Sequence, residues 1–280
     1  MNKICIIGLG WLGQPLADLF IAKNWQVCGT TRTLEKQKAL AARQLSSVRF
    51  NLYDTHSNTI PARYFKGAAL ILNIPPGRSG FVAERFEVQM KGLIEHAFSQ
   101  GLSQLIFVST TAVYGSCKGI ITRVTQTAPS SSSGFAHQTI ENYIKEHFWQ
   151  QSVIVRPSGL VGRQRHPALS LSAKDNISLG LNPINLIHQT DLLAILEKLV
   201  EGNIVEQSFN LSTLDHPSRQ DYYTWCCRKM GIRAPGFSRD DRNENEVDGK
   251  VIDMKSELAV LGIDLKYSSA FDFPLPSVFS

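Results

Sequence analysis

The sequence predicts an α/β protein built on a doubly wound parallel sheet, with a small C-terminal lobe. Short apolar runs rich in β-branched residues alternate with amphipathic segments from residue 3 to residue 212. Such alternation is typical of a parallel sheet buried between two layers of helices. The alternation decays beyond residue 212, and a chain of 280 residues is long enough for a main domain and a smaller lobe.

Seven apolar runs are the predicted strands, because each is short and bounded by polar or glycine-containing segments. In chain order they are "KICIIG" (3–8), "WQVCGT" (25–30), "VRFNL" (48–52), "AALILN" (68–73), "QLIFVS" (104–109), "SVIVRP" (152–157) and "QSFNLS" (207–212).

Helices are predicted where apolar residues recur three or four positions apart. Three such faces are formed by Leu12, Leu16, Leu19 and Phe20, by Phe86, Met90, Leu93 and Ala97, and by Ile140, Tyr143, Ile144 and Phe148. Residues 191–200 and 218–231 are predicted as further helices, and the highly charged residues 238–250 as a loop.

The composition argues against several classes of partner. The chain carries 29 basic and 24 acidic side chains, a net charge of +5, but no basic run of the kind that binds nucleic acid. No uninterrupted apolar run reaches about 18 residues, so we expect no membrane span. The five cysteines show no Cys-x-x-Cys spacing, and Asp18 interrupts the apolar start of the chain. We therefore expect reduced thiols, no metal site, no secretory leader and a cytoplasmic location.

The first predicted strand leads into the motif "GLGWLG", which places Gly8, Gly10 and Gly13 in the pattern Gly-x-Gly-x-x-Gly before a helix. Here the glycines allow a tight turn and a close approach of the main chain to a pyrophosphate, whose charge is favoured at a helix N-terminus. The pattern predicts a Rossmann-type dinucleotide site, with Trp11 and Leu12 in the same loop. The alternative is a glycine turn that only packs the helix on the strand.

The end of the second strand favours NADP over NAD. NAD sites usually carry an acid there, which accepts a hydrogen bond from the ribose 2′-hydroxyl. Residues 29–33 instead read "GTTRT", with no carboxylate before Glu35. Thr31 and Arg32 suit a 2′-phosphate, because a guanidinium donates two hydrogen bonds to phosphate oxygens. The alternative is a solvent-facing arginine beside a loop.

Several longer stretches resemble the extended short-chain dehydrogenases/reductases, the group that includes nucleotide-sugar epimerases and dehydratases. They are "FVSTTAVYG" (107–115), "VRPSGLVGRQRHP" (155–167), "NLIHQTDLLAIL" (185–196) and "MKSELAVLGIDLKY" (254–267), in the family's order. The chain looks most like the poorly characterised branch of NAD(P)-dependent nucleoside-diphosphate-sugar epimerase-like proteins. The resemblance implies an NAD(P)-binding core over residues 1–165. It also implies a lobe that mainly binds substrate over 166–280, with elements at 185–212 returning to the core and a closing helix and strand over 254–267.

The resemblance also implies candidate catalytic residues. In the family, a Ser or Thr four residues before the Tyr of "VYG" bonds the substrate oxygen, and here that residue is Thr110. The family's catalytic Tyr and Lys lie at the start of the next helix. If Glu141 is aligned with the family's glutamate, Ser133 and His137 occupy those two positions. Thr110, Ser133 and His137 are therefore the candidate catalytic residues.

A register two residues further along would place Phe135 and Thr139 at the same two positions, so neither register restores the Tyr/Lys pair. Tyr114 and Lys118 form the only Tyr-x-x-x-Lys spacing in the chain, but they belong to the motif after the fifth strand. We interpret Tyr114 as a residue beside the substrate, together with His188, and Lys118 as a loop lysine.

The cofactor is further expected to contact residues that follow other strands. These are Asn51, Leu52, Asn73, Ile74, Ser109 and Pro157. The leading hypothesis is an NADP-dependent oxidoreductase or epimerase-like enzyme that acts on a small polar substrate, nucleotide-linked substrates included, with a homodimer allowed. The alternative is an NADP-binding or redox-sensing protein that has lost the Tyr/Lys pair and catalyses nothing.

Overall fold

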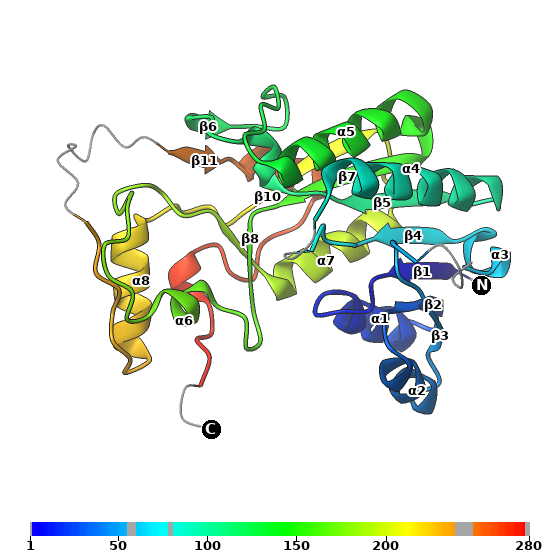
Figure 1. Cartoon of the computed structure of the whole chain (residues 1–280), viewed down its shortest axis with the longest axis horizontal. Coiled ribbons are helices and arrows are strands. Elements are labelled where there is room, and N and C mark those ends of the chain that lie inside the picture. The colour runs from blue at the N-terminus through cyan, green and yellow to red at the C-terminus, as the bar shows by residue number, and fades with distance from the viewer. Residues whose placement is uncertain (1, 55–59, 78–80, 239–248, 278–280) are drawn as a thin grey trace. The chain divides into compact units, whose positions relative to one another are not determined.

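The computed structural model describes residues 2–54, 60–77, 81–238 and 249–277. Its largest feature is a seven-stranded sheet with the strand order β10-β7-β5-β4-β1-β2-β3 (Figure 1). The neighbouring strands from β7 to β3 all pair in parallel. The strands are β1 (Lys3–Ile7), β2 (Gln26–Thr31), β3 (Ser46–Arg49), β4 (Ala69–Leu72), β5 (Gln104–Val108), β7 (Ser152–Pro157) and β10 (Gln207–Leu211).

The chain starts in the middle of this sheet, winds out to one edge through β2 and β3, and then to the other edge from β4 onward. The doubly wound parallel fold predicted from the sequence is therefore confirmed. The helices are α1 (Gly13–Ala22), α2 (Leu34–Ala42), α3 (Ala62–Phe65), α4 (Ala83–Ser99), α5 (Ser132–His147), α6 (Pro167–Leu171), α7 (Gln189–Glu201), α8 (Arg219–Lys229) and α9 (Lys255–Leu261).

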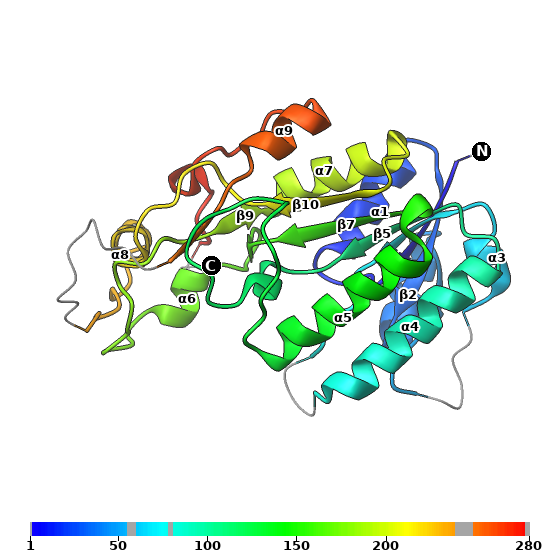
Figure 2. The ribbon, with the colours of Figure 1, turned by 90° about the horizontal axis from the view of Figure 1, so that it is seen from above.

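Two layers of helices cover the sheet. Figure 2 shows α4 and α5 on one face and α1 on the opposite face. The predicted apolar face of α4 is buried, and it packs in one core cluster with β1, β4, β5 and α5. Burial of such a face stabilises a helix more than its intrinsic propensity does. The periodicity in the sequence therefore identified the buried side of α4.

Two segments differ from the sequence-based expectation. The third strand ends at Arg49 instead of continuing to residue 52, because the Asn51 side chain accepts a hydrogen bond from the main-chain N–H of Tyr53 and turns the chain. The expected closing strand after α9 does not form. Instead, the Lys266 N–H donates to the Asp191 carboxylate over 2.7 Å, so this main chain bonds a side chain instead of a strand.

The chain forms two compact units, each assembled from several segments. Unit 1 comprises Met1–Gly115, Pro129–Arg156 and Leu196–Ser208, and unit 2 comprises Ser116–Ala128, Pro157–Ile195 and Phe209–Ser280. The charged residues 239–248, most of the predicted loop, lie outside the described residues. The assignment of substrate binding to the C-terminal part of the chain stays a prediction.

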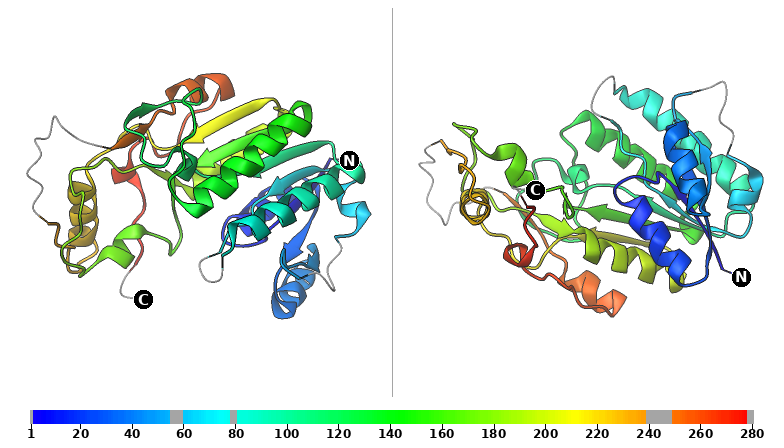
Figure 3. Two further views of the ribbon diagram at one scale, coloured as in Figure 1. Left: turned by 45° about the horizontal axis from the view of Figure 1, so that its top comes forward. Right: turned by 90° about the horizontal axis from the view of Figure 1, so that it is seen from below.

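Unit 2 contains two small parallel sheets and an aromatic core. The strands are β6 (Gly119–Ile121) with β11 (Lys250–Ile252), and β8 (Gly159–Val161) with β9 (Leu186–His188). The short helix α6 lies against α8 (Figure 3). The buried residues Tyr222 and Tyr223 of α8 belong to one core cluster with Ala168 of α6 and with Phe273. Three-residue strands of this kind carry too few residues for a readable alternation pattern.

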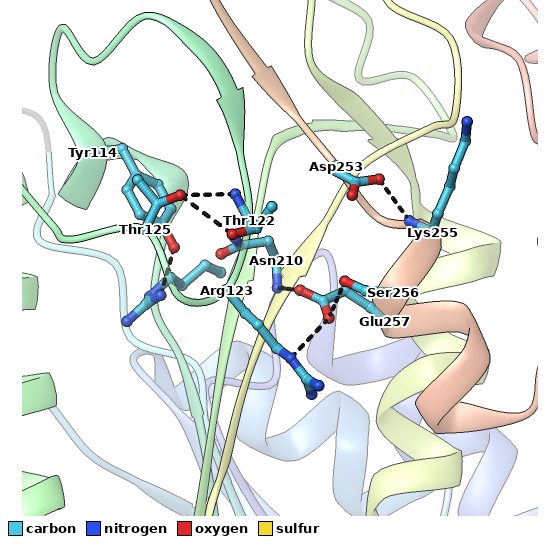
Figure 4. A network of polar contacts seen from close by, with 10 residues as sticks. Tyr114, Thr122, Arg123, Thr125, Asn210, Asp253, Lys255, Ser256 and Glu257 are labelled. Atoms are coloured by element: carbon cyan, nitrogen blue, oxygen red, sulfur yellow. Dashed lines mark hydrogen bonds and ion pairs between the residues drawn. The ribbon is translucent and has the colours of Figure 1, made fainter.

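A buried glutamate on α9 ties together three parts of unit 2 (Figure 4). Glu257 accepts hydrogen bonds from the Asn210 N–H and from the Ser256 hydroxyl, each over 3.2 Å, and pairs with Arg123 at 3.8 Å. Burial raises the pKa of Glu257, and these partners oppose that shift. In the part of the chain that the structure describes, no helix is both long and apolar enough to cross a bilayer.

Candidate dinucleotide-binding site

In the turn between β1 and α1, internal packing requires glycine at two positions, Gly8 and Gly13. Gly8 has φ +104°, and a Cβ atom on it would lie 2.4 Å from the carbonyl oxygen of Asn73. A Cβ on Gly13 would lie 2.2 Å from the carbonyl oxygen of Gly8. Both distances are far below van der Waals contact, so any larger residue at either position would push β4 or α1 away from the turn.

Gly10 differs from its two neighbours in the motif. A Cβ on Gly10 would meet only the Gly8 carbonyl oxygen, at 3.9 Å, and its backbone is not in the left-handed region. Internal packing therefore does not explain why this residue is glycine. The space beside Gly10 is open, and a glycine there lets a ligand approach the main chain closely.

The start of α1 offers main-chain donors beside this open space. No side chain caps the helix, whose N-cap is Leu12. Among the described residues, the N–H groups of Leu12 and Gly13 have no acceptor. Free N–H groups and the positive end of the helix dipole favour an anion at this position. The turn therefore fits a pyrophosphate, and the half-buried Trp11 flanks it.

Two cations lie at the carboxyl end of β2. Arg32 is exposed and has no ion pair or hydrogen bond within the described ranges. Burial lowers the pKa of Lys36 in the first turn of α2, and the charge of Arg32, four positions earlier in the chain, lowers it further. Thr33 caps α2 by accepting from the Lys36 N–H, and the exposed Glu35 lies in the same turn. The sequence-based reasoning missed Lys36, although it stands one helical turn after Arg32.

The other predicted cofactor contacts in unit 1 differ in how far their side chains are exposed to solvent. Asn73 lies against Gly8, and its N–H donates to the Ile7 carbonyl over 3.0 Å. Ile74 packs partly against the core, and Leu52 is buried in it. Asn51 is exposed. Of these residues, Leu52 turns its side chain away from solvent, so only its main chain is available to a ligand.

A buried polar network lies under the end of β5. Ser109 donates its hydroxyl to Glu141 over 2.6 Å, and Arg156 donates to both carboxylate oxygens of Glu141, the shortest contact being 2.6 Å. Arg156 also donates to the Tyr114 hydroxyl over 2.6 Å. Glu141, Arg156 and Tyr114 are each at most 2% exposed. The network joins β5, α5, β7 and the 3-10 helix η1 (Thr111–Tyr114).

This network determines which of the predicted hydroxyls are available. The Ser109 hydroxyl is used inside the protein, and its N–H donates to Val155, so its main-chain carbonyl is the group left for a cofactor. The ring of Tyr114 is wholly buried and its hydroxyl accepts from Arg156, and its predicted place beside the substrate stays a prediction. Lys118 is exposed and lies in unit 2. This network was not predicted from the sequence. The signal that could have revealed it is Arg156, a charged residue next to the apolar run of the strand "SVIVRP".

Thr110 and the start of α5 meet at η1. The Thr110 hydroxyl oxygen accepts from the Ala112 N–H over 3.1 Å, which leaves its own proton free to donate. Gly134 lies so close to η1 that a Cβ on it would be 2.8 Å from the Ala112 carbonyl oxygen. Thr110 and the first turn of α5, which holds Ser133, therefore both border Ala112. Each of the two side chains is half-buried.

His137 lies one turn further along α5 and is 4% exposed. Its Nδ1 lies 2.7 Å from the Ser133 carbonyl oxygen, which requires a proton on Nδ1 and leaves Nε2 as an acceptor. The ring packs beside Phe86 and Phe107, and burial lowers its pKa, so the imidazole is neutral at pH 7. In the alternative register, Phe135 is exposed and Thr139 half-buried.

Two predicted site residues belong to unit 2. Pro157 is buried at the end of β7. His188 is also buried, with its ring against Tyr267 and Phe273, and its Nδ1 accepts from the Thr190 N–H. Its Nε2 therefore carries the proton, and this donor has no partner among the described residues. Burial lowers the pKa of His188, which keeps the ring neutral.

Comparison with protein families identifies the chain. The model of the NAD dependent epimerase/dehydratase family matches residues 4–174, which include the glycine turn, the network and the start of α5. The chain belongs to this family. The family resemblance drawn from the sequence motifs is therefore confirmed.

Individual relatives extend this likeness over the whole chain. Protein YeeZ of Escherichia coli K12 is 28% identical over an alignment of 278 residues that covers 98% of this chain and 100% of the relative. UDP-glucuronic acid 4-epimerase from Bacillus cereus, solved with NAD, is 18% identical with a TM-score of 0.77, covering 95% of this chain and 92% of its own. MoeE5, solved with UDP-glucose and NAD, is 15% identical with a TM-score of 0.76, covering 95% and 94%. At these identities the two solved structures demonstrate the shared fold.

Proposed function

We propose that this protein is a cytoplasmic NADP-dependent oxidoreductase or epimerase that acts on a small polar substrate of the nucleotide-linked sugar class. The observation that carries the cofactor assignment is the pair of neighbouring cations, Arg32 and Lys36, beside the glycine turn. The substrate class is supported by family membership and by the UDP-sugar ligands of the solved neighbours.

The preference for NADP rests on this chain's own residues, since both solved neighbours hold NAD. A guanidinium beside an ammonium raises the local positive potential, and a dianionic 2′-phosphate relieves their mutual repulsion. The exposed Glu35 reduces that advantage without removing it, because this stretch carries two positive side chains and one carboxylate. The ribose 2′-hydroxyl of NAD is uncharged, so it gains no comparable electrostatic stabilisation from Arg32 and Lys36.

Arg32→Ala tests this assignment. The parent protein is expected to bind NADPH roughly 10- to 150-fold more tightly than NADH, the equivalent of about 1.5–3 kcal/mol for a charge-assisted contact. Arg32→Ala should remove most of that preference, and Lys36→Ala a smaller part, because the Arg fork donates two hydrogen bonds and Lys acts as a point charge. Fluorescence titration of both cofactors with each variant measures the ratio.

Arg43→Ala is the matched control, since Arg43 is exposed near the end of the same helix and is paired with Asp18. It should leave the NADPH-to-NADH ratio unchanged. Equal affinities of the parent protein for the two cofactors would reject the NADP assignment.

The candidate catalytic groups have separate roles in this proposal. Thr110 donates its free hydroxyl proton to a substrate oxygen, since its oxygen is already held by the Ala112 N–H. Ser133 contributes a second hydroxyl from the first turn of α5. His137 accepts a proton or a hydrogen bond at Nε2, because its Nδ1–H is bound to the Ser133 carbonyl. When bound, the nicotinamide cofactor supplies hydride transfer.

Three substitutions test whether Thr110, and not Tyr114 or Lys118, acts on the substrate once a substrate is found. Thr110→Val should lower kcat by on the order of 100-fold, in the range of a lost proton-transfer or orienting group. Tyr114→Phe should leave turnover within roughly a few-fold, although it removes an acceptor from Arg156 and costs about 1–3 kcal/mol of stability. Lys118→Ala should have less effect than either. If Tyr114→Phe instead proved the most damaging to turnover, the active site would have to be rebuilt around Tyr114.

The second candidate function is an NADP-binding or redox-sensing protein without turnover. The deep burial of His137 and the absence of a Tyr-x-x-x-Lys spacing on α5 favour it. Steady consumption of NADPH with a UDP-sugar ketone, or interconversion of UDP-sugar epimers, would exclude it. Binding of NADPH with no turnover across a panel of nucleotide sugars would favour it over the enzyme.

A further inference from the structure

Thr30 accepts two hydrogen bonds from the glycine turn, one at its side-chain hydroxyl and one at its main-chain carbonyl. The Gly8 N–H donates to the Thr30 hydroxyl oxygen over 3.1 Å, and the Leu9 N–H donates to the Thr30 carbonyl over 2.9 Å. Thr30 is paired with Ile7 in the β1–β2 ladder, so β2 reaches the start of the turn. The hydroxyl replaces the acceptor that the parallel ladder no longer provides beyond Ile7.

The orientation of the Gly8 peptide in turn controls the rest of the turn. The Gly8 carbonyl accepts from the Gly10 N–H over 2.7 Å, and it is the same oxygen that leaves no room for a side chain on Gly13. A rotation of the Gly8 peptide would therefore move the open position at Gly10 and the first turn of α1 together. On the other side, the Asn73 carbonyl limits how far Gly8 can move.

We propose that Thr30 is a positioning residue of the dinucleotide site, whose hydroxyl holds the glycine turn in the form that receives the pyrophosphate. This rests on the proposed function, because it presumes that a dinucleotide binds at this turn. Thr30 is 2% exposed and its hydroxyl oxygen is occupied by the Gly8 N–H. Thr30 therefore acts on the dinucleotide through Gly8. The residues that follow Thr30, Arg32 among them, discriminate between a 2′-phosphate and a 2′-hydroxyl on the cofactor ribose.

A specific signature separates this role from that of Arg32. The pyrophosphate is common to NADPH and NADH, so a turn that loses its alignment weakens both cofactors by the same factor. Thr30→Val keeps the shape of the side chain but removes the acceptor of a buried N–H. We expect it to weaken NADPH and NADH alike by about tenfold, with their affinity ratio unchanged. Arg32→Ala should change the ratio instead.

Thr30→Ser retains the hydroxyl and should bind both cofactors within about threefold of the parent. Thr213→Val is the matched control, because Thr213 is a buried threonine of unit 2 whose hydroxyl donates to the Asp215 carbonyl over 3.0 Å. It removes a buried hydroxyl far along the chain from the turn and should leave both cofactor affinities unchanged. Titrations are combined with hydrogen exchange of the Gly8 amide, which should be slow in the parent and in Thr30→Ser.

Parent-like affinity of Thr30→Val for both cofactors would overturn the proposal, as would a loss confined to NADPH. If Thr30→Val does not fold, Thr30→Cys serves instead, because its thiol is close in size and a weak acceptor. Thr30→Cys should then bind both cofactors more weakly than Thr30→Ser, and equal binding by the two variants would overturn the proposal. If the parent protein binds neither NADPH nor NADH, the proposed function is rejected. Hydrogen exchange tests the hydrogen bond independently of cofactor binding, because a fast-exchanging Gly8 amide in the parent protein would show that Thr30 does not hold the Gly8 N–H.

Discussion

Gly10→Val is expected to weaken NADPH binding by on the order of 100-fold or more, equivalent to about 2.8 kcal/mol, in a protein that still folds. Internal packing tolerates a Cβ on residue 10, since the nearest protein atom, the Gly8 carbonyl oxygen, would be 3.9 Å away. The same side chain would occupy the space through which the pyrophosphate approaches the main chain. Titration with NADPH measures the loss, and circular dichroism with thermal unfolding measures the fold.

Two other glycines supply matched controls. Gly92 lies on the exposed side of α4, where a Cβ would have no neighbouring atom within 4 Å, so Gly92→Ala should bind NADPH normally and gain about 0.4–1 kcal/mol of stability. Gly13→Ala should unfold at a lower temperature, because its Cβ would lie 2.2 Å from the Gly8 carbonyl oxygen. NADPH affinity that survives Gly10→Val would place the cofactor elsewhere in the chain.

Arg156→Met is expected to lower the free energy of unfolding by about 3–5 kcal/mol, a large part of the stability of an ordinary domain. It removes the ion-pair partner of a carboxylate that is 1% exposed and leaves the buried charge of Glu141 with the Ser109 hydroxyl but without a counter-charge. The linear hydrocarbon of Met occupies most of the same volume, so the loss reports the charge and its hydrogen bonds. Chemical denaturation at pH 7 measures the difference from the parent.

The exposed pair Arg233–Asp175 is the control, with side chains that are 66% and 59% exposed. Arg233→Met should cost at most about 1 kcal/mol, because water screens an exposed pair. The double variant Arg156→Met with Glu141→Leu should be more stable than Arg156→Met alone, since no unpaired charge remains. A loss in Arg156→Met no larger than that in Arg233→Met would show that the buried network contributes little to folding.

The elements of the sheet were predicted well because their signals are local. The apolar run 104–109 and the face formed by Phe86, Met90 and Leu93 follow from the spacing of residues within one strand or one helix. The third strand was displaced by a side-chain hydrogen bond at Asn51, and the small strands of unit 2 carry three residues each. Neither effect leaves a periodic pattern that can be read in advance.

The candidate site was predictable only in part, because its contacts join distant residues. The hydrogen bond between Gly8 and Thr30 spans 22 positions, and that between Arg156 and Tyr114 spans 42. Tyr114 illustrates the consequence. Its spacing to Lys118 imitates a catalytic pair, whereas the fold buries its ring and directs its hydroxyl to Arg156.

By itself the sequence determined the order of strands and helices, the position of the glycine turn and the absence of an acid from residues 29–34, since these depend on neighbouring residues. Only the tertiary structure decided which chemically similar groups are occupied inside the protein and which are left available to a ligand. Gly8 and Gly13 are confined by packing, whereas Gly10 is open. Ser109 and Thr110 are adjacent hydroxyls, yet the first bonds buried Glu141 and the second retains a free proton. Successive side chains at the end of a strand point to opposite sides, so one enters the core and the other faces the site.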